Sequence, residues 1–543
     1  MPTLNWIGKD KVVNHHQDVP YRILEHKYGF TAENGEQELE TKSGNKIIHG
    51  DNLEALKALL PEYEGKIKCI YIDPPYNTGN EKWVYNDNVN HPKIKKWLGE
   101  VVGKPGEDFT RHDKWLCMMY PRLKLLHKLL ANDGAIFISV DDNEQAPLRL
   151  ILDEIFGANK FIGQISWFKK RKGSYLSKEF ISLTEYVICY RKNERLNLFG
   201  GKPNSEESQP LVKRTNAIST LYFPANTVNT KLPSGDYPAG KYGKGSSSVE
   251  LLNDIKISDN IVKSEFKLKG PFIWSQDFLN NELEIGSKLV MNTKNLQPRA
   301  FRNSDDKFKG FPSFIDGREF AATNDDAYEN LIEIFGREKV FDYSKPYNYV
   351  KYLINSILYF DKDAVVLDSF AGSGTTAHSV IKLNQEDGGK RKFVLIEMED
   401  YANETTAFRV KKVLTGYGEE PGTGGEFDFY ELGTPIFKDN KNLNEEVGEA
   451  KIREYIYYTE TKQHLEREQS PEHKYLLDTY NETGYYFYYE KDRLTTLSLD
   501  TLNIVTEKAE QYLIYADTCH LDKEYMLAKN IIFKKIPRDI KRF

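Results

Sequence analysis

A strand of this chain ends on a tetrapeptide that is suited to hold an aromatic amine. The mostly apolar run over residues 68–72 is followed by Asp73, Pro74, Pro75 and Tyr76, and prolines stop a strand because they cannot donate to a sheet ladder. A planar aromatic amine is a poor nucleophile because its lone pair is delocalised into the ring. The Asp73 carboxylate and the Pro74 carbonyl can each accept one N–H and localise that lone pair, while Tyr76 offers a face for stacking. The tetrapeptide therefore predicts transfer chemistry at an amino group, with a turn carrying a solvated Asp as the plainer alternative.

A glycine-rich turn much later in the chain is suited to a cofactor. Phe370, Gly372 and Gly374 follow a strand expected over residues 364–368 and precede an expected helix. Glycines let backbone amides approach a ligand closely, and a helix N-terminus favours an anionic group. The next expected strand ends on Glu397, where a carboxylate can accept hydrogen bonds from both hydroxyls of a ribose. The pair indicates a nucleoside-containing cofactor; the lack of a GxxxxGK[ST] lysine argues against a triphosphate, and a purely structural turn stays open.

The elements that must position these residues alternate between strands and helices. Strands are expected over residues 45–52, 67–72, 135–140, 364–368 and 392–397. Helices are expected over 53–60, 120–134, 146–157 and 346–358, and a turn that leads into a helix over 369–384. Such alternation is typical of an α/β fold with a parallel, doubly wound sheet, which binds ligands at the carboxyl ends of its strands. We expect this sheet to be built from two separated segments of the sequence. Pro121 is expected near the start of its helix.

Two regions break the alternation. The stretch from 169 to 335 is rich in Asn, Ser, Gly and Lys with weak periodicity, which indicates an inserted domain or a set of recognition loops. It opens on the basic run Lys169, Lys170, Arg171 and Lys172, a candidate phosphate-binding surface, although a solvated face is an equal reading. The last region is rich in tyrosine and charge, and we expect a small α+β domain there. The predicted domains are 1–168, 169–335, 336–418 and 419–543.

The composition is that of an ordinary soluble globular chain. Of 543 residues, 39% are hydrophobic and 29% are charged, and the chain is too long for one compact core. It has no apolar segment of signal-peptide length and no run of about eighteen apolar residues, which predicts a cytoplasmic protein. Its four widely spaced cysteines predict buried reduced thiols, without a disulfide framework or a metal site. A net charge of −6 argues against a uniformly basic coat but allows local basic patches.

The combination of motifs resembles a known family. DPPY together with FAGSGTT is similar to the motifs of amino-DNA methyltransferases that use S-adenosylmethionine, and their order here resembles the permuted beta class. The resemblance narrows to the modification (Mod) subunits of type III restriction-modification systems and covers nearly the whole chain. The stretches that carry it are WIGKDKVVNHHQDVPYRIL, HGDNLEALKALLPEYEGKIKCIYIDPPYNTGN, DKWLCMMYPRLKLLHKLLANDGAIFISVDDNE and YELGTPIF. The resemblance implies a Rossmann-like methyltransferase sheet whose insert is a target-recognition domain.

The resemblance also implies a role for individual residues. The catalytic set would be Asp73, Pro74, Pro75 and Tyr76. The cofactor-binding set would be Phe370, Gly372 and Gly374 around the methionine part, Glu397 on the ribose, Lys345 of YSKP at the carboxylate, and Asp51 of HGDN at the adenine. For Asp51, a simple turn cap is almost as good an interpretation. The run Lys169, Lys170, Arg171 and Lys172 would contact DNA.

The implied reaction is methyl transfer from S-adenosylmethionine to N6 of an adenine that is flipped out of duplex DNA and stacked on Tyr76. Transfer to N4 of cytosine uses the same geometry and stays open, although Asp rather than Ser at position 73 favours adenine. Methylation at carbon 5 of cytosine is disfavoured because no Pro-Cys dipeptide occurs. An RNA or protein-amide methyltransferase is disfavoured because such enzymes usually have an Asn-initiated tetrapeptide. A chain that only recognises DNA for a nuclease is disfavoured because it would not need both motifs. The resemblance further implies a homodimer and a helicase-endonuclease (Res) partner; the DNA sequence recognised cannot be read here.

Overall fold

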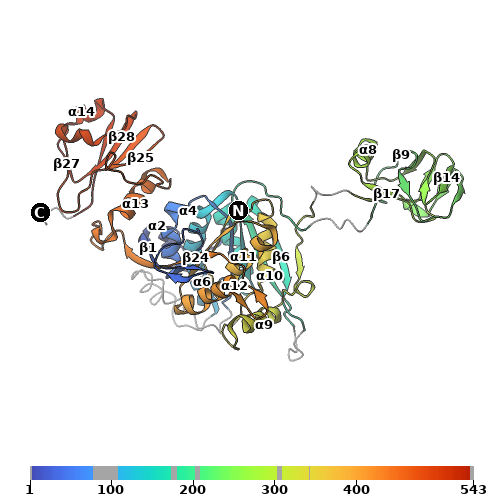
Figure 1. Ribbon diagram of the computed structural model, residues 1–543, viewed down its shortest axis with the longest axis horizontal. Coiled ribbons are helices and arrows are strands. Elements are labelled where there is room, and N and C mark those ends of the chain that lie inside the picture. Colours follow the sequence, from blue (N-terminus) through green and yellow to red (C-terminus); the bar gives the residue numbers. More distant parts are fainter. Residues whose placement is uncertain are drawn as a thin grey trace. The chain divides into compact units, whose positions relative to one another are not determined.

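The chain folds into two compact units (Figure 1). One consists of Met1–Leu198 with Pro312–Phe543, and the other of Phe199–Phe311. The computed structural model describes residues 3–77, 108–172, 180–201, 208–302, 308–341 and 343–538. In these ranges no helix combines the length and the apolar character that crossing a bilayer requires.

A mixed eleven-stranded sheet forms the centre of the first unit. Its strands follow the order β19-β6-β7-β5-β4-β20-β21-β3-β24-β1-β2. In that order they span Phe314–Asp316, Phe161–Phe168, Thr184–Arg191, Leu130–Val140, Ile67–Ile72, Val365–Asp368, Lys392–Glu397, Lys46–His49, Glu426–Pro435, Arg22–Thr31 and Gly35–Gln37. The strands from β5 to β24 are all parallel, whereas β7 is antiparallel to both of its neighbours. The α/β class predicted from the sequence is thus confirmed.

The strand order brings the two motif-bearing strands together. β20 pairs in parallel with β4, with Val366 beside Cys69 and Leu367 beside Ile70. From this pair the sheet grows in opposite directions, from β4 to β5 on one side and from β20 to β21 on the other. Such a reversal is the point at which open α/β sheets bind ligands, at the carboxyl ends of the strands. The turns after β4 and β20 therefore share one edge of the sheet, although they come from distant parts of the sequence.

Helices cover both faces of this sheet (Figure 1). One layer contains α1 (Lys9–Val12), α2 (His15–Asp18), α3 (Asn52–Ala58), α4 (Leu60–Tyr63), α6 (Asp108–Leu129) and α7 (Gln145–Leu152). The other contains α9 (Asn324–Phe335), α10 (Tyr347–Leu358), α11 (Thr375–Asp387) and α12 (Phe408–Thr415). Because both faces are covered, the central strands are mostly apolar and mostly buried.

One local prediction is wrong. Pro121 lies inside α6, which begins at Asp108, rather than near the start of a helix. An interior proline removes a backbone hydrogen bond and costs about 3 kcal/mol. The turn before it buries Trp115, Leu116 and Met119, and this apolar burial outweighs the local penalty. Tertiary packing has therefore overridden the helix-start signal.

Two predicted domain boundaries also differ from the structure. β7, β19 and α9 fall inside the predicted insert of 169–335 but belong to the first unit, which limits the second compact unit to Phe199–Phe311. β24 lies beyond the predicted boundary at 418, yet it enters the main sheet between β3 and β1. β19 and β24 pair with strands that are remote in sequence, so local composition could not assign them.

The second unit consists mainly of short strands. A seven-stranded sheet has the order β11-β14-β15-β10-β17-β18-β8 and a four-stranded sheet the order β12-β13-β16-β9. The strands β8 to β18 span Gln209–Pro210, Ser219–Phe223, Val228–Asn229, Gly235–Tyr237, Gly240–Tyr242, Val249–Leu251, Ile255–Ser258, Ile261–Val262, Phe266–Gly270, Lys288–Val290 and Arg299–Phe301, with helix α8 at Gln276–Glu284. The unit has its own apolar core, in which Phe223 stacks on Phe266 at 4.8 Å. Strands of two to five residues are too short to give a clear sequence period.

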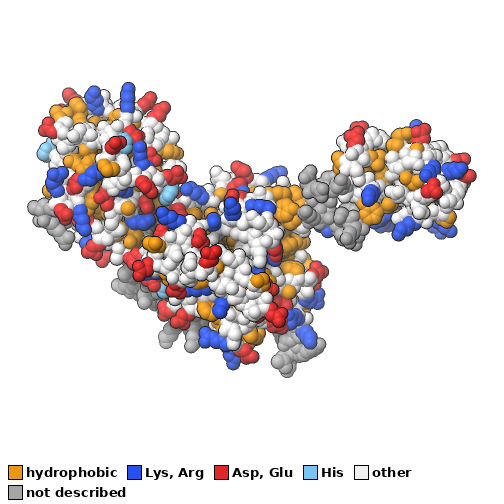
Figure 2. Space-filling view, in the orientation of Figure 1, with side chains coloured by type: hydrophobic (Ala, Val, Ile, Leu, Met, Phe, Trp, Pro, Cys, Tyr) orange, Lys and Arg blue, Asp and Glu red, His pale blue; other side chains and the backbone are white. Residues whose placement is uncertain are grey.

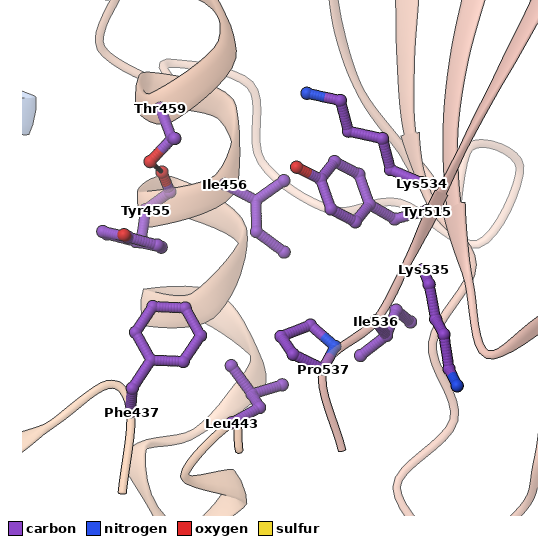
Figure 3. A pocket seen from close by; sticks show the side chains of 10 residues that line it. All are labelled: Phe437, Leu443, Tyr455, Ile456, Thr459, Tyr515, Lys534, Lys535, Ile536 and Pro537. Atoms are coloured by element: carbon purple, nitrogen blue, oxygen red, sulfur yellow. Dashed lines mark hydrogen bonds between the residues drawn. The ribbon is translucent and has the colours of Figure 1, made fainter. Parts of the chain in front are cut away.

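The C-terminal part of the first unit carries a second, smaller sheet. Its order is β25-β26-β28-β30. The elements here are α13 (Glu449–Thr461), β25 (Leu476–Tyr480), β26 (Thr483–Phe487), β27 (Thr496–Leu497), β28 (Gln511–Ala516), β29 (Thr518–Cys519), α14 (Lys523–Ala528) and β30 (Ile531–Lys535), after the short pair β22 (Gly416–Tyr417) and β23 (Glu420–Pro421). A mostly apolar cavity of about 360 Å³ lies between α13 and the strands β28 and β30 (Figure 3). None of the predicted site residues lines it.

Candidate active site

The turn after β4 holds Asp73 at the carboxyl edge of the sheet. Asp73 Oδ2 lies 2.9 Å from Lys345 Nζ, whereas Asp73 Oδ1 is buried and has no hydrogen-bond partner among the described residues. Burial raises the pKa of Asp73, and the Lys345 ammonium opposes that rise. A buried acceptor without a donor costs about 1–3 kcal/mol. Asp73 Oδ1 is therefore an acceptor that a ligand N–H can satisfy.

The rest of the tetrapeptide is held rigidly. The Tyr76 hydroxyl donates to Glu185 Oε2 at 3.0 Å, and Lys345 Nζ lies 4.7 Å from the centre of the Tyr76 ring. The Trp115 indole N–H donates to the Pro75 carbonyl at 2.7 Å. These contacts fix the tyrosine ring and the proline backbone before any substrate binds, which is the preorganisation that orientation-based catalysis needs.

Glu185 is a site residue that sequence reasoning missed. It lies on β7 with 7% of its surface exposed, and it accepts from Lys169 Nζ at 2.7 Å and lies 3.4 Å from Lys345 Nζ. Burial alone would raise the pKa of Glu185, but Lys345 and Lys169 hold it below its ordinary value. No motif marks this residue; the available signal was a lone acid at the start of the apolar run YVICY.

A buried acid anchors the residue that follows the tetrapeptide. Asn77 has a left-handed backbone with φ 59°, and its side-chain amide donates to Glu144 Oε1. His112 Nδ1 lies 2.6 Å from the same oxygen, and burial raises the pKa of Glu144 to about 7. The hydrogen bond to Glu144 thus fixes Asn77 at the end of the turn. Thr78 and Gly79 of the same motif lie outside the described residues.

The glycine turn after β20 is held by two buried acids. The Phe370 amide donates to Asp368 Oδ1 at 3.0 Å, and the Gly372 amide donates to Glu397 Oε2 at 2.7 Å. Burial raises the pKa of Asp368 and of Glu397 to about 7. Gly374 has φ 82°, and a Cβ there would lie 3.0 Å from a backbone carbonyl, so glycine is required on both counts.

The residues predicted to hold a cofactor gather at this edge. The Gly50 amide donates to the Glu397 carbonyl at 2.9 Å, which brings the turn of Asp51 beside the glycine turn. Asp51 Oδ1 caps α3 by accepting from two backbone amides, so the capping interpretation is confirmed. Its other oxygen is buried, 3.7 Å from the Arg122 guanidinium and without a hydrogen bond. Glu397 Oε1 accepts from the Glu399 amide at 3.1 Å, and a carboxylate with two such bonds retains acceptor capacity.

Other predicted residues make contacts of a different kind. The Lys345 ammonium, predicted at a cofactor carboxylate, contacts Asp73 and Glu185. In the basic run, Lys169 pairs with Glu185, while Arg171 pairs with Glu329 at 2.8 Å and with another acid of α9. Cationic and anionic side chains are interspersed on the face drawn in Figure 2. The run is therefore partly neutralised rather than a free cationic strip.

The fold and the site together define a class of protein. A glycine turn and an acid on adjacent strands at the switch point are typical of sites for nucleoside-containing cofactors. Beside them lie an acceptor without a donor and a fixed aromatic ring. This is an α/β enzyme that transfers a group between a cofactor and a bound substrate.

Comparison with known proteins identifies the family. The family model described as DNA methylase matches residues 67–408. The type III restriction-modification enzyme StyLTI Mod subunit of Salmonella typhimurium is 31% identical over 85% of this chain and 67% of its own length. Type II methyltransferase M.KpnI of Klebsiella pneumoniae is 31% identical over 65% of this chain and 81% of its own length. The chain belongs to the DNA methylase family: it is a DNA methyltransferase related to type III Mod subunits, as its motifs predicted.

Two further facts define the extent of these similarities. The chain spans 64–67% of the length of three of the type III Mod subunits that it matches, and 54% of a fourth. The solved structure of TTHA0409, a putative DNA modification methylase from Thermus thermophilus, aligns with 72% of this chain and 100% of its own, at 13% identity and a TM-score of 0.32.

Proposed function

We propose that this methyltransferase transfers the methyl group of S-adenosylmethionine to N6 of an adenine flipped out of duplex DNA. The observation that carries the proposal is the buried Asp73 Oδ1, which has no hydrogen-bond partner among the described residues and lies in a turn whose tyrosine ring is already fixed. An exocyclic amine brings the N–H that this oxygen lacks. A duplex base reaches such a pocket only after it leaves the stack, and an aromatic face then holds it.

The residues at the edge of the sheet fit the cofactor. Gly372 and Gly374 have positive φ angles and allow close approach to the methionine part, while Glu397 retains acceptor capacity for ribose hydroxyls. We assign to Asp51 Oδ2, which is buried and lacks a hydrogen bond, the role of accepting from the adenine amine of the cofactor. S-adenosylmethionine, when bound, supplies a methyl group on a cationic sulfonium.

The chain contributes orientation and hydrogen bonds to the transfer. Asp73 Oδ1 and the Pro74 carbonyl accept the two N–H groups of the target amine and so localise its lone pair. The Lys345 ammonium opposes the rise that burial causes in the pKa of Asp73 and so favours its ionised, accepting form. The Tyr76 ring stacks on the base. Asp73 then takes the proton that the methylated nitrogen releases.

We assign DNA recognition to the second unit, Phe199–Phe311. The support is its independent core and the pattern of β16, where Lys267 and Lys269 are exposed between buried apolar residues. Exposed cations along a strand suit phosphate contacts. We also propose that the chain is the modification and recognition subunit of a type III system, with its two motif-bearing segments in the permuted order of the beta class, that it forms a homodimer, and that it serves a Res subunit.

Single-molecule sequencing of DNA from cells that express the protein tests the reaction. We expect N6-methyladenine in one sequence context, its loss with Asp73→Ala, and its retention with Asp363→Ala, which replaces an exposed acid before β20. Purified Asp73→Ala should still bind cofactor and duplex. N4-methylcytosine in place of N6-methyladenine would reassign the target base, and unchanged methylation by Asp73→Ala would refute the mechanism.

A further inference from the structure

We infer that Glu185 is a positioning residue of the methyl-transfer site, which orients the stacking ring of Tyr76 and sets how strongly Asp73 accepts a hydrogen bond. The inference rests on the proposed function, because it concerns the same pocket. It assigns a role to a residue of β7, a strand antiparallel to the strands that carry the motifs.

The first part of the role concerns the tyrosine ring. The Tyr76 hydroxyl donates to Glu185 Oε2 at 3.0 Å and also lies close to Asp73. With two acceptors near one hydroxyl, the acceptor with the shorter and better-aligned bond decides the tilt of the ring. Glu185 is itself fixed, because its other oxygen accepts from Lys169 at 2.7 Å. A base that stacks on Tyr76 therefore meets a ring plane set by Glu185 of β7 rather than by Asp73 of the turn itself.

The second part concerns charge. Lys345 is 8% exposed and lies between two carboxylates, 2.9 Å from Asp73 and 3.4 Å from Glu185. Its single positive charge is therefore shared. Lys169 neutralises Glu185 from the other side, and Asp141 and Tyr349 also interact electrostatically with Glu185. By drawing on Lys345, Glu185 leaves Asp73 a stronger acceptor than a one-to-one pair with Lys345 would.

The burial of the Glu185 carboxylate points to a role in function rather than in stability. Buried ion pairs gain little over apolar residues of the same volume, because desolvation offsets the attraction. The neighbouring position on β6 is Trp167, which pairs with Glu185 in register and stacks on Tyr349 at 4.2 Å. An apolar residue at position 185 would suit that wall. The carboxylate instead contacts two residues of the transfer site and Lys169 beside them.

Steady-state kinetics of Glu185→Gln and Glu185→Leu, on the duplex that sequencing identifies, test the inference. Gln still accepts from Tyr76 but carries no charge, so Lys345 pairs with Asp73 alone and holds the pKa of Asp73 lower than in the wild type. We expect the acid limb of kcat/KM to move to lower pH, kcat at neutral pH to fall about tenfold, and KM for S-adenosylmethionine to stay unchanged. In Glu185→Leu both roles are lost, and kcat at neutral pH should fall further, by about a hundredfold. Gln at this position therefore rescues part of the loss.

Two comparisons separate positioning from a general structural defect. Tyr76→Phe combined with Glu185→Leu should cost less than the sum of the single changes, because both remove the same hydrogen bond. Glu194→Gln, at an exposed position after the same strand, should behave as wild type. A loss that is equal at every pH and is not rescued by Gln, or wild-type kinetics for both variants at position 185, would overturn the inference while leaving the proposed function intact. An inactive wild-type protein would instead refute the proposed function.

Discussion

Replacing Lys345 by Met tests the electrostatics of the site most directly. The Lys345 ammonium is buried between Asp73 and Glu185, and Met preserves most of its length without its charge. Lys169 still neutralises Glu185 in this variant, whereas Asp73 retains no cation among the described residues. Burial then acts on Asp73 with less opposition and raises its pKa further. A larger fraction of the carboxyl group is then protonated, and the protonated form can no longer accept both an N–H and a proton.

The size of the effect follows from the geometry. Removing one partner of a buried ion pair costs about 3–5 kcal/mol, because the other charge is left uncompensated. At about 1.4 kcal/mol for each tenfold change in rate, this predicts that methyl transfer at neutral pH falls by about 10²- to 10⁴-fold. Because the defect is a protonated carboxyl group, activity should recover as the pH rises, about tenfold per pH unit until Asp73 ionises.

Single-turnover methyl transfer, followed from pH 6 to pH 9.5 with saturating cofactor, measures this dependence. Lys351→Met is the matched control, since Lys351 lies on α10 and pairs with Glu386 away from the site; it should match the wild type at every pH. If Lys345→Met loses the same factor at every pH, Lys345 does not act through the charge of Asp73. Loss of cofactor affinity with an unaltered pH profile would return Lys345 to the role at the cofactor carboxylate that its motif implied.

Two further predictions concern the cofactor and DNA. Burial raises the pKa of Glu397 from an ordinary 4.5 to about 7, and the ionised form is the better acceptor for ribose hydroxyls. The affinity for S-adenosylmethionine, measured by calorimetry, should therefore rise by up to about tenfold as the pH increases through 7. In Glu397→Gln the affinity should not change with pH. An equal pH dependence in both proteins would remove Glu397 from the ribose. Duplex binding is measured by fluorescence anisotropy at several salt concentrations. Lys172→Ala should lower the slope of log affinity against log salt concentration by about 1, whereas Arg171→Ala should lower it less because Glu329 and Asp326 already neutralise Arg171. Equal effects of the two substitutions would show that DNA displaces those acids.

The local features of the site could be predicted because their physics is local. Proline stops a strand wherever it occurs, and glycine at a positive φ is needed for a tight turn before a helix. Asp73 at the end of β4 and Gly374 before α11 follow from these rules. Pro121 shows their limit, because buried neighbours decided that helix against its own proline. The role of Asp51 as a cap was likewise readable, since capping involves only residues within one turn.

The sequence by itself determined the alternation of strands and helices, the two motifs and the class of chemistry. Each depends on residues within a few positions of one another, or on the period of burial. Only the tertiary structure decided that β4 lies beside β20, that β24 joins the main sheet, and that Lys345 and Glu185 meet at Asp73 and Tyr76. Those outcomes depend on pairing between strands far apart in sequence and on which charges share a buried space, and neither leaves a local pattern. DPPY predicts where an amine binds, whereas the charged groups beside Asp73, on Lys345 and Glu185, come from outside the motif.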